Sequence, residues 1–157
     1  MKRRYVIADV FTDTPFLGNP VAVVLDAQGM STEQMQRIAV EFGYSETTFV
    51  LPPADPANTA QVRIFTPSRE IPFAGHPNVG TAYVLAYYAA LEGAPFPETM
   101  LFEEIAGLVP VKILKEDGVI TGAELLVPEA LSCRSEVSPE NVAACLSLAP
   151  EDICTTT

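Results

Sequence analysis

The chain has little of the residue chemistry that most metal sites use. Its 157 residues include one histidine and three cysteines, and they include no tryptophan. Cys133, Cys145 and Cys154 show no C-x-x-C spacing and have no histidine near them in the sequence, which argues against a zinc site. We therefore expect no zinc site, and free thiols in a cytoplasmic protein.

Long apolar runs and basic residues are also scarce. No uninterrupted apolar run approaches the roughly 20 residues of a transmembrane helix, and the apolar stretch near the N-terminus is too short for a signal peptide. Nine basic side chains face 20 acidic ones, for a net charge of −11. This balance disfavours nucleic acid and anionic membranes as partners. Hydrophobic residues make up 48% of the chain, which excludes a disordered protein.

The only histidine lies in the most informative stretch, residues 71–82. Gly75 before it allows close approach of a backbone N–H, and Pro77 after it suits the first position of a helix. Residues 79–91 carry no charge, so we predict a buried central helix over about 77–92. Its free N–H groups would attract an anion. The alternative is an ordinary loop of turn-forming residues in which His76 has a structural role.

Alternating and β-branched segments around this helix predict strands. They lie near residues 4–10, 21–25, 47–51, 60–66, 99–105 and 108–115. An amphipathic surface helix opens at Ser31, whose capping box includes Gln34, and ends at Gly43. Glu46 then stands at a helix-to-strand corner, where the plain interpretation is a surface glutamate. The simplest architecture is α+β, with a rolled, mostly antiparallel sheet around the central buried helix.

The pattern begins again after Gly118. We predict a strand over 119–127 and a helix that Ser138 caps, with Pro139 at its first position. One strand and one helix cannot bury a core alone. We therefore expect an N-terminal lobe at 1–116 and an incomplete start of a second lobe at 117–157.

Four segments match one known family in order and spacing, and the match as a whole covers about residues 4–115 strongly and the remainder weakly. They contain Gly18-Asn19-Pro20, Ser45-Glu46-Thr47, Arg63-Ile64-Phe65 and Gly75-His76-Pro77. Together they resemble the PhzF-like (phenazine biosynthesis-like) isomerases, which have the diaminopimelate-epimerase-like fold. The resemblance implies two lobes, each a rolled sheet around a central helix, with the active site between them.

The resemblance also implies roles for individual residues. Glu46 matches the catalytic acid/base, and Ser45, Gly75 and His76 match substrate-binding positions. The archetype moves a proton between carbons of dihydro-hydroxyanthranilate without a metal or organic cofactor. A carboxylate in a closed apolar site can remove and return such a proton near neutral pH. The implied partners are a small carboxylated substrate and a second copy in a homodimer.

The chain departs from this pattern in two ways. Racemases of the fold use paired cysteines, but residues 74–76 include none, which disfavours a two-thiol mechanism. Nothing matches the second lobe's Gly-Asp-Pro-x-Thr-Gly-Ser-Ala loop either, so half of the expected site is missing. We expect little or no isomerase activity from these residues alone. The alternatives are a non-catalytic binding or self-association module, and an amino-acid epimerase or dehydratase that uses Glu46.

Overall fold

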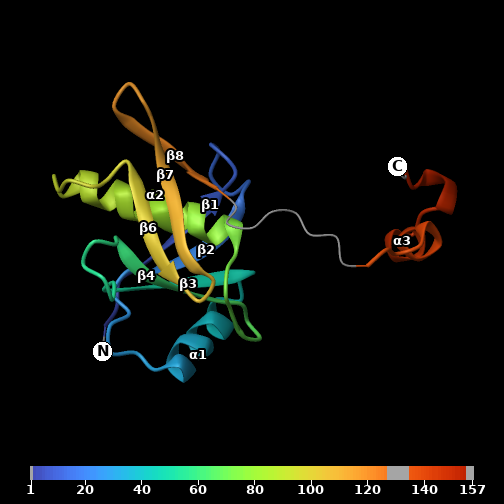
Figure 1. Ribbon diagram of the computed structural model, residues 1–157, viewed down its shortest axis with the longest axis horizontal. Helices are drawn as coiled ribbons and strands as arrows, with labels where there is room; N and C mark the ends of the chain where they lie inside the picture. Colours follow the sequence, from blue (N-terminus) through green and yellow to red (C-terminus); the bar gives the residue numbers. More distant parts are fainter. Residues whose placement is uncertain (1, 127–134, 155–157) are drawn as a thin grey trace.

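The computed structural model describes residues 2–126 and 135–154, and its main body is one curled sheet around a helix (Figure 1). In these residues the sheet has eight strands in the order β1-β2-β3-β4-β6-β7-β8, with β5 paired to β4. The strands are β1 (Tyr5–Val10), β2 (Asn19–Val24), β3 (Glu46–Leu51), β4 (Ala60–Phe65), β5 (Glu70–Ile71), β6 (Thr99–Glu104), β7 (Gly107–Glu116) and β8 (Val119–Leu125). The helices are α1 (Thr32–Phe42), α2 (Gly75–Leu91), α3 (Pro139–Leu146) and a 3₁₀ turn, η1 (Pro150–Asp152). The predicted α+β class and rolled sheet are confirmed.

The first half of the sheet combines a hairpin with a crossover. β1 and β2 pair antiparallel around residues 11–18. α1 then carries the chain to β3, which runs parallel to β2. The capping box of Ser31 and Gln34 and the left-handed Gly43 both form as predicted. On the outer face of the sheet, Met35 and Ala39 of α1 pack against the apolar side chains of Val24, Phe49 and Phe65.

α2 fills the concave side of the sheet (Figure 1). Its early turns are buried, Gly80 included, and Ala82, Val84 and Ala86 pack in the main core. The sequence suggested Pro77 as the first helical residue. The helix instead begins at Gly75, which makes Pro77 its third residue. A proline costs no hydrogen bond there, because the first four N–H groups of a helix have no partner within it.

The sheet continues past the expected lobe boundary. β8 pairs antiparallel with β7, so residue 116 lies within a hairpin of the same sheet. The reason is that the turn at Asp117 and Gly118, both with positive φ, folds the chain back onto the same sheet. The division into two lobes itself stays a prediction.

The last described residues form a small helical unit. α3 begins after Ser138 with Pro139 at its start, as predicted, and it contacts η1. Cys145 and Cys154 are exposed free thiols, whereas Cys133 lies outside the described residues. Within residues 2–126 and 135–154, no helix combines the length and apolar character needed to cross a bilayer.

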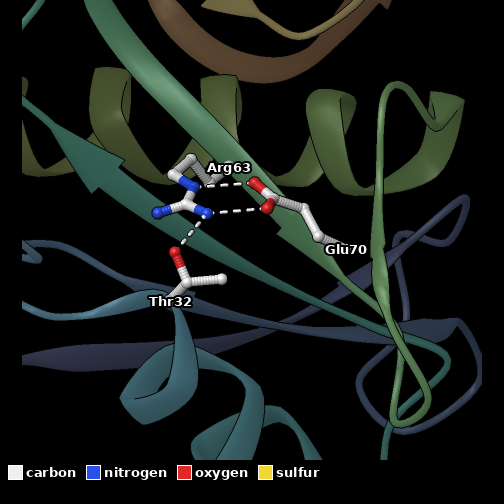
Figure 2. A network of polar contacts seen from close by, with 3 residues as sticks. All are labelled: Thr32, Arg63 and Glu70. Carbon is white, nitrogen blue, oxygen red and sulfur yellow. Dashed lines mark hydrogen bonds and ion pairs between the residues drawn. The ribbon is translucent and has the colours of Figure 1, made fainter.

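A polar clamp joins β4, β5 and α1 on the outer side of the sheet (Figure 2). Arg63 donates from Nε and Nη2 to the two oxygens of Glu70, at 2.7 and 2.6 Å, and from Nη2 to Thr32 Oγ1 at 2.9 Å. The hydrogen bond to Glu70 raises the pKa of the Arg63 guanidinium. This fork holds the short β5 against β4 just before the chain enters the Gly75 loop.

Candidate active site

Glu46 and His76 meet at one end of the curled sheet. Glu46 is the first residue of β3, and His76 is the second residue of α2. Glu46 Oε2 lies 3.1 Å from His76 Nδ1, and the side chains are 18% and 9% exposed. The sequence placed these two residues on separate segments, and the fold brings their side chains into contact.

The Glu46 carboxylate keeps one oxygen without a hydrogen bond. Oε2 is buried, and its approach to the His76 ring is close in distance but lacks hydrogen-bond alignment. A buried oxygen without a donor has unused capacity to accept a proton. This is the property that a general base needs.

The other ring nitrogen of His76 faces the backbone. Nε2 lies 3.4 Å from the carbonyl oxygen of Pro20, at the start of β2. A carbonyl only accepts, so this contact requires the proton on Nε2. In the neutral ring Nδ1 then carries a lone pair toward Glu46. Sequence reasoning missed the contact of Pro20 with His76, because the carbonyl oxygen that makes it belongs to the backbone of a predicted turn.

Ser45 lies at the edge of the same site. It is exposed, and its hydroxyl is 3.3 Å from Asn19 Oδ1, so the oxygen of the Asn19 amide accepts from the Ser45 O–H. Asn19 and Pro20 precede the first buried residues of β2, which pairs in parallel with β3 beginning at Val21 and Glu46. The parallel pairing explains why two neighbouring strand starts supply the site.

Gly75 opens α2 and leaves space in front of it. A Cβ at Gly75 would meet only Leu125 Cδ2, at the ordinary contact distance of 3.9 Å. The preceding residue, Ala74, has no side chain that can cap the helix. The first N–H groups of α2 therefore have no side-chain partner at Ala74, and a helix end of this kind suits an anion.

A buried hydrogen bond fixes how α2 sits over β3. Thr48 and Thr81 share a hydroxyl contact of 2.8 Å, and both are fully buried. Thr48 follows Glu46 by two residues, so both point to the helix side of the strand. The contact fixes the position of the N-terminal part of α2 relative to Glu46 on β3.

Two hollows open beside the start of α2. One of about 520 Å³ lies between β1 and β8 and includes Asp9, Gly80 and Thr121. Another, of about 450 Å³, reaches Gly75 and Leu125. The Glu46–His76 pair lines neither hollow. The β1–β2 loop near the pair instead exposes a group of large apolar side chains, Phe11, Phe16 and Leu17.

Comparisons with known proteins find one matching family and several relatives. A family model described as phenazine biosynthesis-like protein matches residues 8–150. An uncharacterized isomerase from Mesorhizobium japonicum is 45% identical over 153 residues, which cover 96% of this chain and 49% of that protein. A trans-2,3-dihydro-3-hydroxyanthranilate isomerase from Pseudomonas aeruginosa is 44% identical over 126 residues, 80% of this chain and 42% of that protein.

The solved structures give the same fold. A predicted epimerase from Pseudomonas aeruginosa superposes with a TM-score of 0.75 at 30% identity, and the match covers 96% of this chain and 52% of that one. The chain thus spans about half the length of the relatives it matches.

Proposed function

Because this chain belongs to the phenazine biosynthesis-like protein family, whose model matches residues 8–150, we propose that it supplies the Glu46 half of a cofactor-independent isomerase. The reaction is a proton shift on a small cyclic or amino carboxylic acid. The observation that carries the proposal is the buried Glu46 oxygen without a hydrogen bond, 3.1 Å from His76.

In this proposal Glu46 removes a proton from one carbon and returns it to another. The His76 ring, held by the Pro20 carbonyl, steadies the carboxyl group as it changes charge. The uncapped start of α2 at Gly75 and the exposed Ser45 hydroxyl bind the substrate carboxylate. Positioned acid–base groups of this kind contribute about 10²- to 10⁴-fold to rate.

We further propose that these 157 residues alone turn over little or no substrate. The exposed Phe11, Phe16 and Leu17 support this, because apolar side chains beside a polar site favour a second wall packed against them. The second wall also accounts for the relatives' greater length. A homodimer and a cytoplasmic location are further parts of the proposal.

A chimera tests the role of Glu46 directly. Residues 1–126 replace the matching half of the Pseudomonas aeruginosa relative, and the substrate is the acid in that relative's name. We expect turnover that falls at least about 100-fold in Glu46→Gln. Glu41→Gln removes an exposed glutamate from α1 and serves as the matched control. A folded chimera with equal activity in Glu46→Gln and the parent would refute the assignment.

Two further measurements separate the alternatives. Incorporation of solvent deuterium at one carbon without a double-bond shift would identify an epimerase. Turnover by the 157 residues alone, lost in Glu46→Gln, would overturn the need for a second wall.

A further inference from the structure

Asn78 and Glu104 hold four buried polar atoms that lack a hydrogen-bond partner in the described residues. These are Nδ2 and Oδ1 of Asn78 and both carboxyl oxygens of Glu104. Asn78 is fully buried in the first turn of α2, two residues after His76. Buried polar atoms are almost always paired, so four together require an explanation.

Glu104 approaches Asn78 from the sheet. It ends β6, and the alternation of the strand places it on the same face as the buried Met100 and Phe102, toward α2. Apolar side chains share that face from the neighbouring strands, Val62 and Ile64 on β4 and Val109 and Val111 on β7.

Apart from His76, the charged side chains of the elements around Asn78 and Glu104 point away from this pair. Arg63 on β4 and Lys112 on β7 alternate with the inward residues and so point to the outer face. On the first two turns of α2, His76 is the one titratable side chain. The β6–β7 turn also contacts the loop before α2, since Ala106 N–H donates to the Pro72 carbonyl at 3.2 Å.

The chemistry of the four atoms favours a protonated carboxyl group. An ionised carboxylate only accepts, so it leaves Asn78 Oδ1 without a donor. A carboxylic acid and an amide match completely: the acid O–H donates to Oδ1, and the amide N–H donates to the other carboxyl oxygen. Burial raises the pKa of Glu104 to about 7, and the nearby Asn78 amide lowers it more weakly, although no atom pair reaches hydrogen-bond geometry.

We propose that protonated Glu104 and Asn78 form a buried acid–amide pair that positions the first turn of α2, and with it His76 relative to Glu46. Both are positioning residues, because His76 and not the pair contacts Glu46. The inference does not depend on the reaction proposed above. It assigns a role to a buried acid that the proposed mechanism leaves unused.

The single histidine makes the test specific, because the ring signals in an NMR spectrum of the 157-residue protein belong to His76 alone. Glu104→Gln keeps the paired geometry, since two amides also form a two-bond pair. Glu104→Leu and Asn78→Leu cannot form it. At pH 6 we expect unchanged His76 ring signals in Glu104→Gln and shifted signals in both leucine variants. The same shift in Glu104→Gln and Glu104→Leu, or no shift in any of them, overturns the proposal.

A second measurement decides the question if the leucine variants do not fold. In wild-type protein labelled with ¹³C at glutamate carboxyl carbons, we expect one signal to titrate near pH 7 and to be missing from Glu104→Gln. A Glu104 signal that titrates in the ordinary glutamate range refutes the acid–amide pair, because the carboxyl group would then be ionised at pH 6.

Discussion

Thr48 and Thr81 share a 2.8 Å hydrogen bond in the buried contact between β3 and α2. The bond joins the strand that carries Glu46 to the helix that carries His76, so it ties the geometry of the candidate site to the stability of the core. The polar contacts that hold α2 can therefore be tested one at a time.

Thr48→Val should destabilise the protein by about 1–3 kcal/mol, since it leaves the Thr81 hydroxyl buried without a partner. The double variant with Thr81→Val should cost less than the sum of the two single changes. Thr47→Val is the matched control, because the buried Thr47 Oγ1 already lacks a partner and its removal should be neutral or stabilising. Urea unfolding of wild type, the two single variants and the double variant gives the coupling energy between Thr48 and Thr81. A strictly additive double variant would contradict the coupling.

Gly80→Ala should destabilise the fold although alanine favours helices. A Cβ at Gly80 would lie 2.6 Å from Val21 Cγ1 and 2.9 Å from Val10 Cγ2. We expect a net loss of about 1–3 kcal/mol from overpacking, measured by thermal unfolding. Val21→Ala in the same chain should recover part of this loss, and an increase in stability from Gly80→Ala alone would show that the helix can move away from β2.

Local signals made part of this fold predictable. The Ser31 capping box, Gly43 and the uncharged run of α2 each act within a few residues, and the structure confirms all three. Two site positions were also indicated by the local sequence: Gly75, which precedes the only histidine, and Glu46, which lies between a predicted helix and a predicted strand.

Contacts between distant segments were harder to predict. The Pro20 carbonyl oxygen belongs to the backbone, so the residue type at this position could not indicate its contact with His76. Glu104 follows Glu103, and two adjacent acids read as a solvated strand end. In the structure Glu103 instead binds the N–H groups of Ala54 and Asp55, at 2.7 and 2.8 Å, while Glu104 is turned inward. The curl of the sheet decides which of the two is buried.

Glu70→Gln should cost about 1–2 kcal/mol, because it removes a charge-assisted, two-bond fork from Arg63. Arg63→Lys should lose a similar amount, since a lysine cannot reproduce the fork or reach Thr32 in the same geometry. Glu33→Gln breaks the exposed pair with Arg37 and should change stability by less than about 0.5 kcal/mol. Equal effects of Glu70→Gln and Glu33→Gln in urea unfolding would show that burial adds nothing to the fork.

Glu104→Gln should change how stability depends on pH. Burial raises the folded-state pKa of Glu104 from 4.5 to about 7, so the folded protein binds the proton more tightly than the unfolded chain. Its contribution is therefore present below pH 4.5 and is lost as the pH rises to about 7, by up to about 3 kcal/mol. The free energy of unfolding of wild type minus that of Glu104→Gln, measured from pH 4.5 to 8, should fall over this window and then become constant. The subtraction cancels the other acids, which both proteins share. A difference that stays constant or rises with pH would mean that Glu104 is ionised in the folded protein at neutral pH.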